Sequence, residues 1–236
     1  MLAVAAPARA AVIQSAQVKR VIDGREVFID GRTAKPGSVA RSGQQLRTGR
    51  SRAELVFDGR TVGFMGRSSV LNVGSQCLRL DRGAVLVSGP QKTCLGTKVL
   101  GVRATTTILQ RESDSYNVIT LEGVAYVDEP GGYEEQRLSR PSPAEGAAAP
   151  APAPASASTS TSTTSSIPVV DADPSGRTTY ICGCEVAQFN LQGEFQRQAT
   201  LSRTQLLAAV NRFTDDKLEL PPEVAERIQD SIANCR

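Results

Sequence analysis

The sequence predicts a mainly β protein, an antiparallel sandwich or roll of about ten short strands, followed by a disordered linker and a small C-terminal α or α+β piece. Three observations predict it. Acidic-Gly pairs recur between residues 18 and 128, and such pairs favour hairpin turns because Gly, and to a lesser degree Asp, tolerates positive φ. Short runs rich in Val, Ile, Leu and Phe lie between the pairs. A tract of Pro, Ala, Ser and Thr then ends the pattern.

The β domain is expected over residues 18–135. Its turn signals are Asp23-Gly24, Asp30-Gly31, Asp58-Gly59, Asp81-Arg82-Gly83 and Glu122-Gly123. Alternation is clearest before Asp58, where Ala53, Leu55 and Phe57 share one face of a strand. The predicted strands are Arg25–Ile29, Ala53–Phe57, Thr61–Met65, Val70–Val73, Cys77–Leu80, Ala84–Val87, Lys98–Val102, Thr105–Gln110, Tyr116–Leu121 and Val124–Val127.

Residues 136–172 are expected to be the linker. The tract from Pro141 to Pro168 contains almost no large apolar side chain, so it cannot offset the entropy of ordering. Because such a tract buries nothing, we expect the parts on either side to behave as independent units. Limited proteolysis is then expected to leave a stable all-β fragment ending near residue 135.

Residues 173–236 are predicted to form a small, cysteine-containing helical domain. A strand is expected at Thr178–Ile181. Ser202 is a suitable cap for a helix over Thr204–Phe213, with an apolar stripe of Leu206, Leu207, Val210 and Phe213. Pro221 and Pro222 suit the first turn of a second helix, in which Val224, Ile228 and Ile232 repeat at four-residue spacing.

Residues 1–10 resemble the end of an export signal. Ala8-Arg9-Ala10 is a small-residue cleavage site after a short apolar stretch. The basic region and the longer apolar region of a complete signal do not precede it, so an Ala-rich tail is the alternative. No later segment has the ~18 apolar residues that cross a bilayer. We expect a periplasmic or extracellular protein without a membrane span in this chain.

The composition argues against most enzyme classes. The sequence contains no His, so it offers no imidazole base and no His metal ligand. Carboxylates alone can hydrolyse glycosides, which keeps a carbohydrate-active protein as one alternative. The net charge is +3 and the Arg residues are scattered, a pattern that does not indicate nucleic-acid binding. We therefore expect no catalytic residue, cofactor or metal.

The five cysteines are candidates for structural disulfides, which form in oxidising compartments. Cys77 and Cys94 are expected to pair across the hairpin that turns at Asp81–Gly83, with two buried free thiols as the alternative. Cys235 is expected to pair with Cys182 or Cys184. The spacing of Cys182 and Cys184 is too short for a C-x-x-C redox or zinc motif, and the odd count leaves one cysteine over.

Six motifs follow one another between residues 36 and 128. They are Pro36–Gly49, which ends in Thr-Gly; Arg52–Arg60; Ser69–Val73; Leu80–Val87; Val102–Thr105; and Leu121–Val127. Together they resemble the FecR domain family. Two departures are Arg60, where the family has Ser after Asp-Gly, and Ala104, where it has Gly in Val-Arg-Gly-Thr.

The resemblance implies an extracytoplasmic β domain rather than a specific ligand. The family's namesake is a membrane-spanning regulator that passes a ferric-citrate signal from an outer-membrane receptor to a sigma factor, and other members are stand-alone exported proteins. We expect this chain to be a non-enzymatic recognition protein that binds a protein or an envelope polymer such as a polysaccharide or peptidoglycan. The sensor part of a transmembrane signalling regulator is the alternative.

Overall fold

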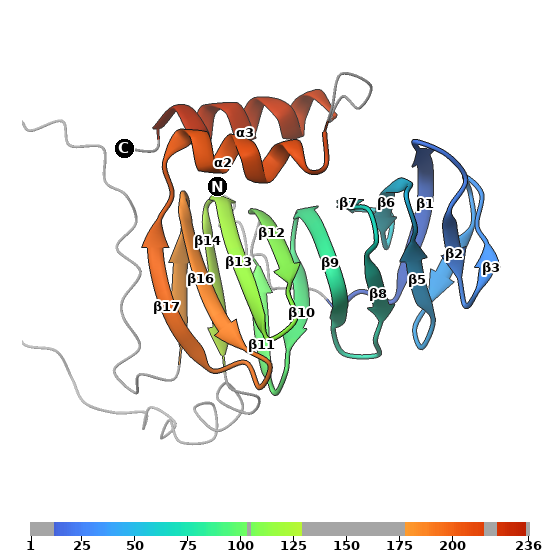
Figure 1. Ribbon diagram of the computed structural model, residues 1–236, viewed down its shortest axis with the longest axis horizontal. Helices are drawn as coiled ribbons and strands as arrows, with labels where there is room; N and C mark the ends of the chain where they lie inside the picture. The colour runs from blue at the N-terminus through green and yellow to red at the C-terminus, as the bar shows by residue number, and fades with distance from the viewer. Residues whose placement is uncertain (1–11, 103–104, 129–177, 215–220, 235–236) are drawn as a thin grey trace, which may run out of the picture.

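The structure is a computed structural model that describes residues 12–102, 105–128, 178–214 and 221–234. It confirms the predicted fold class: the chain is mostly β, with two helices near its C-terminus (Figure 1). The export-signal segment 1–10 and the linker 136–172 lie outside the described residues. None of the described helices is both long and apolar enough to span a bilayer.

The strands and helices are short, as predicted. They are β1 (Ser15–Ile22), β2 (Val27–Ile29), β3 (Arg32–Thr33), β4 (Val39–Arg41), β5 (Gln45–Thr48), β6 (Arg52–Phe57), β7 (Thr61–Met65), β8 (Val70–Val73), β9 (Leu78–Ser88), β10 (Gln91–Leu95), β11 (Lys98–Val102), β12 (Thr106–Arg111), β13 (Ser115–Glu122), β14 (Val124–Asp128), β15 (Thr179–Cys182), β16 (Glu185–Asn190), β17 (Phe195–Thr200), α2 (Arg203–Asn211) and α3 (Pro222–Asn234).

The strands form two sheets that share β9. Sheet A has the order β4-β1-β6-β7-β9-β12-β13-β16-β17 and is antiparallel throughout. Sheet B has the order β3-β2-β5-β8-β9-β10-β11-β14-β15. It is antiparallel except where β10 runs parallel to β9, with Thr93 opposite Leu78. In both sheets the N-terminal strands therefore lie at one end of the molecule and the C-terminal strands lie at the other end.

The hairpin predicted at Asp81–Gly83 is wrong. The segments Cys77–Leu80 and Ala84–Val87 belong to the single strand β9, which pairs with β8 in sheet B and then with β7 and β12 in sheet A. Gly83 has φ +85°, and a Cβ at this position would collide with Ser69. The glycine therefore lets the strand bend between the sheets instead of reversing direction.

Two apolar cores hold these layers together. The larger lies between the sheets and includes Leu55, Leu71, Val87, Leu100 and Val118. The second lies on the outer face of sheet A, where helices α2 and α3 pack (Figure 1). Sheet A contributes to it Phe64, Leu86, Ile108, Ile119 and Leu121. Because the central strands of sheet A are covered on both faces, β12 is buried at almost every position.

The two helices follow the sequence pattern, except that Leu207 of the predicted apolar stripe is 42% exposed. Ser202 caps α2, and its side chain and that of Gln205 form a capping box. Leu206 and Val210 of α2 are buried against sheet A. In α3, Val224, Ile228 and Ile232 form the buried stripe that their spacing predicts.

The C-terminal segment is not a separate helical domain, which corrects the expectation of independent units. It is α+β, and its strands extend the sandwich: β15 pairs with β14 in sheet B, and β16 pairs with β13 in sheet A. Its helices bury their apolar stripes on sheet A. The physical reason is that two short helices bury too little surface alone, whereas β13 and β14 offer unpaired edges and sheet A offers an uncovered apolar face.

Candidate functional site

The disulfide predicted between Cys77 and Cys94 is present, with the two Cα atoms 5.6 Å apart. Its setting differs from the prediction, because the two cysteines do not lie on opposite arms of a hairpin. Cys77 immediately precedes β9, and Cys94 lies in β10 where these strands run parallel, opposite Arg79. The bond therefore joins strands at the place where sheet B has its single parallel contact, and its role is structural.

The C-terminal cysteines divide into two kinds. Cys184 takes part in a disulfide, whereas Cys182 is an exposed free thiol at the end of β15. Burial and the nearby Glu185 carboxylate raise the pKa of the Cys182 thiol, so it is a weak nucleophile at neutral pH. Cys235 lies outside the described residues.

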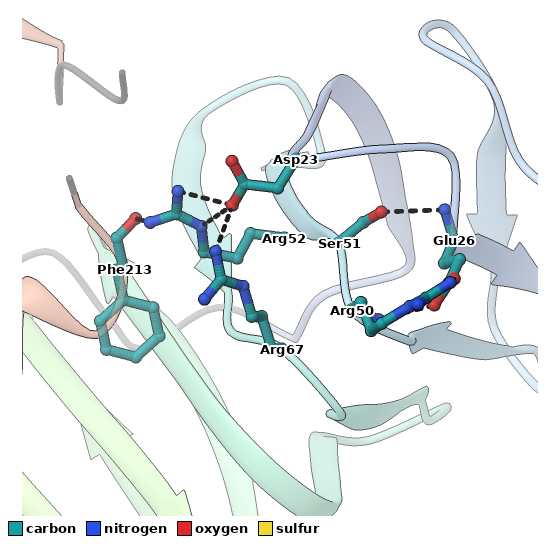
Figure 2. A network of polar contacts seen from close by, with 7 residues as sticks. All are labelled: Asp23, Glu26, Arg50, Ser51, Arg52, Arg67 and Phe213. Carbon is teal, nitrogen blue, oxygen red and sulfur yellow. Dashed lines mark hydrogen bonds and ion pairs between the residues drawn. The ribbon is translucent and has the colours of Figure 1, made fainter. Parts of the chain in front are cut away.

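A partly buried ionic network joins both halves of the fold (Figure 2). The side chain of Arg52 in β6 is only 3% exposed. Its Nε and Nη2 atoms lie 2.8 Å and 2.7 Å from Asp23 Oδ2, and Nη1 donates to the Phe213 carbonyl at 2.9 Å. Arg67 Nη2 reaches the same Asp23 oxygen at 2.8 Å. The network thus ties the β1–β2 turn and strand β6 to the end of α2.

The electrostatics of Asp23 fit a structural role. Burial acts to raise the pKa of Asp23, but hydrogen bonds from Arg67 and Arg52 outweigh it and hold that pKa below its ordinary value. The carboxylate is therefore charged and engaged with two guanidinium groups at neutral pH. Its contacts with Arg52 and Arg67 hold the β1–β2 turn against β6, so we assign the network to stability rather than to ligand binding.

Other polar motifs of the sequence also serve the fold. Thr105, Thr106 and Thr107 are buried, so they do not present hydroxyl groups on the surface. Asp58 and Gly59 both have positive φ, as a tight hairpin turn requires. Within the described part of the chain, no three Cys, Asp or Glu side chains are grouped as metal ligands would be.

The two ends of the sandwich differ in how their edge strands are protected. At the N-terminal end the edges are β3 and β4, of two and three residues, which carry the exposed Arg32 and Arg41. Short, charged edges resist pairing with other chains. At the opposite end the edge of sheet A is β17, with six residues that are all exposed. No strand in the described ranges pairs with its outer side.

The interior of the sandwich is incompletely covered beside β17. Phe195, the first residue of β17, is 46% exposed and contacts the buried Phe189 edge to face, with ring centroids 5.9 Å apart. Leu191, in the turn before β17, is 36% exposed. These are two of the three large apolar side chains that are exposed among the described residues. The core between the sheets therefore ends at two partly exposed apolar side chains, Phe195 and Leu191, which form an apolar rim beside the edge strand β17.

Comparison with known proteins does not assign this arrangement to a family. No protein-family model matches the chain, and no curated protein matches it. The FecR resemblance therefore remains a prediction that the motifs between residues 36 and 128 carry.

Sequence reasoning did not find the β17 edge, because β16 and β17 were not predicted as strands. The segment from Phe195 to Thr200 has three polar residues in succession and no apolar alternation. A weak signal was present in Asn190–Glu194, where Gly193 adopts φ +87° in the turn that joins the two strands.

Proposed function

We propose that this protein is a non-enzymatic, exported recognition protein of the cell envelope that binds a protein partner by strand pairing at β17. One observation carries the proposal: a six-residue edge strand with all its side chains exposed lies beside the half-exposed ring of Phe195. An edge of this length with a single charged residue, Arg197, is weakly protected and invites aggregation. Short charged strands protect the edges at the other end of the molecule. We infer that the β17 edge stays exposed because a partner strand binds to it.

Strand pairing also defines the partner. An added strand gains main-chain hydrogen bonds from the β17 backbone, and the side chains that alternate along it provide specificity. The partner segment needs an apolar residue opposite Phe195, because that position faces the rim of the core. A polysaccharide lacks alternating N–H and C=O groups, so this edge favours a protein over a polysaccharide.

Three further features support the envelope location. The Cys77–Cys94 disulfide fits an oxidising compartment. The small-residue site at Ala8–Ala10 is of the type that a signal peptidase cleaves. The motifs of residues 36–128 resemble a family of extracytoplasmic domains.

Hydrogen exchange tests the proposal. The full chain is mixed with detergent-solubilised envelope proteins of its source cell, and separately with purified peptidoglycan sacculi. We expect the amides of residues 195–200 to exchange fast in the protein alone and to become protected with the protein extract but not with sacculi. Protection that rises with the concentration of this chain alone would show self-association and would overturn the proposal.

Matched variants locate the contact. Phe195→Ala is expected to lower the protection of the β17 amides in the extract about tenfold or more, since a buried aromatic anchor is worth more than 1.4 kcal/mol. Leu207→Ala is the control, because Leu207 is similarly exposed, at 42%, but belongs to helix α2 and not to the strand edge. Equal effects of the two variants would contradict binding at β17.

A further inference from the structure

A second surface feature lies at the other end of the molecule, beyond the function proposed above. A hollow of about 440 Å³ opens between the β2–β3 hairpin and the loops that precede β4 and β5. Figure 1 places β2 and β3 at the end of the long axis opposite β17. The volume of the hollow falls within the range of about 300–1,000 Å³ that is typical of small-molecule sites.

The polar side chains of the hollow are already held in place by the backbone. Asp30 accepts hydrogen bonds from the Gln45 N–H at 2.9 Å and from Gln44 Nε2 at 2.7 Å. Gln44 Oε1 in turn accepts from the Arg41 N–H at 2.9 Å, and Ser38 Oγ accepts from the Lys35 N–H at 3.0 Å. A ligand therefore meets fixed groups at Asp30, Gln44 and Ser38, which lowers the entropic cost of binding.

These groups keep hydrogen-bonding capacity that the fold does not use. Each Asp30 carboxylate oxygen accepts one of the two bonds that it can accept. The Gln45 N–H, followed by the Gln44 side chain, lowers the pKa of Asp30, so the carboxylate is an acceptor at neutral pH. The Ser38 hydroxyl still has its proton to donate. The Arg32 side chain forms no hydrogen bond or ion pair within the described part of the chain, although its charge helps to lower the pKa of Asp30, so its guanidinium is an available donor.

The charges of the lining select the ligand class. Asp30 and Arg32 both line the hollow, so an anion is attracted by Arg32 but repelled by Asp30, and a cation is attracted by Asp30 but repelled by Arg32. A neutral ligand with several hydroxyl groups avoids both penalties, since it donates to the carboxylate and accepts from the guanidinium. Ile29 and Ala34 add apolar surface, which suits the C–H face of a sugar ring.

We propose that this hollow binds a neutral saccharide unit, whose hydroxyl groups donate to Asp30 and accept from Arg32 and Ser38 while its ring lies against Ile29 and Ala34. The ligand is either a free sugar or a residue of a glycan chain. Because the hollow is open to solvent, binding is weak, with a dissociation constant on the order of 1 mM.

Nuclear magnetic resonance titration of the full chain tests the proposal with three matched probes. They are N-acetylglucosamine, which is neutral, glucuronate, which is anionic, and glucosamine, which is cationic. We expect saturable shift changes at residues 29–34, 38 and 44 with the neutral sugar, at several-fold lower concentration than with either charged probe. Tighter binding of the N-acetylglucosamine trimer than of the monomer would assign the ligand to a glycan chain, and equal binding would assign it to a free sugar.

Variants connect these shifts to named groups. Asp30→Asn is expected to weaken binding about tenfold, because a hydrogen bond to a charged group is lost. Its control is Asp58→Asn, since Asp58 has the same φ of +46° in another Asp-Gly turn outside the hollow. Arg32→Gln, which removes no bond of the fold, is expected to weaken binding several-fold.

Absence of saturable shifts at the hollow, preference for a charged probe, or wild-type affinity in Arg32→Gln would each overturn this proposal. None of these results bears on strand pairing at β17, because the two sites lie at opposite ends of the molecule and the amides of residues 195–200 provide a separate readout.

Discussion

Arg52 illustrates how single side chains connect distant parts of this fold. Its guanidinium binds Asp23, 29 residues before it, and the Phe213 carbonyl, 161 residues after it. A buried guanidinium is stabilising only when its partners are in place, because its desolvation is costly. The geometry of the β1–β2 turn and the position of α2 are therefore coupled through one side chain.

This coupling predicts an acid-sensitive contribution to stability. The pKa of Asp23 is lowered in the folded protein, so its contribution is fully present above the unfolded pKa of roughly 3.9 and is lost as pH falls through the folded value. We expect Asp23→Asn to lower the free energy of unfolding at pH 7 by about 2 kcal/mol. Below pH 4 the difference in the free energy of unfolding between variant and wild type is expected to become smaller. Urea unfolding at a series of pH values measures this difference.

Asp81→Asn is the control, because Asp81 is 44% exposed and its ion pair with Arg79 spans 3.4 Å. This pair and its exposed hydrogen bond from Asn72 contribute little to stability. If the free energies of unfolding of Asp23→Asn and wild type differ by the same amount at every pH, the charged Asp23 carboxylate does not stabilise the fold in the way proposed.

The sequence could predict part of this network but not its centre. Asp23-Gly24 was predicted as a turn, and both residues do have positive φ, because Asp and Gly tolerate it locally. Arg52 looked like one of many scattered Arg residues. Its importance depends on Phe213, and no local pattern reveals a contact over 161 positions.

Two turns from different sheets meet where β10 turns into β11 and β16 turns into β17. The Thr97 N–H donates to the Gln192 carbonyl at 2.9 Å. Gly96, at φ +60°, lies so close that a Cβ would collide with the backbone of Leu191 and Gln192. The contact joins the strands before the linker, which we call the β body, to the C-terminal strands β16 and β17.

We therefore expect Gly96→Ala to destabilise the protein more than a matched glycine substitution. Gly59→Ala is the match, since Gly59 has φ +70° but an added Cβ there meets nothing within 4 Å. Both variants incur about 1–2 kcal/mol for the left-handed backbone, and Gly96→Ala adds about 2 kcal/mol of overpacking. Chemical denaturation of both variants gives the difference, and equal losses would show that the turn contact is loose.

Most predicted strands lie where alternation or apolar runs mark them. β1 and β10 were missed although they bury alternate side chains, and β17 was missed because pairing alone makes it. The predicted segments 98–102 and 61–65 coincide with β11 and β7. Strand β17 has no buried side chain to mark it, and it exists because β16 offers a partner edge. The bend in β9 was read as a turn because Gly83 suits both, and only the neighbouring strands distinguish them.

At the scale of the whole molecule, the C-terminal segment completes the sandwich. It extends sheet A beyond β13 and sheet B beyond β14. It also covers the apolar outer face of sheet A. Three polar contacts add to this: Arg227 Nη2 donates to Ser88 Oγ at 2.8 Å, Ser231 Oγ bonds to the Leu121 carbonyl, and Arg52 bonds to that of Phe213.

This architecture predicts that the β body does not survive alone. A fragment of residues 1–135 would expose Phe64, Leu86, Ile108, Ile119 and Leu121 on sheet A, together with the edges of β13 and β14. A contiguous apolar patch of this kind promotes aggregation. We expect the fragment, expressed by itself, to be insoluble or to lack a cooperative unfolding transition in circular dichroism.

A chain cut between Pro141 and Pro168 should behave differently, because the cut breaks the backbone and leaves every described contact in place. The two pieces are expected to co-elute in size-exclusion chromatography under reducing and non-reducing conditions and to separate only in denaturant, since β-pairing and the apolar face of the helices hold them together. Full-length protein carried through the same steps is the control. A soluble 1–135 fragment with an unfolding midpoint equal to that of the whole chain would instead mean that the C-terminal strands and helices are dispensable to the sandwich.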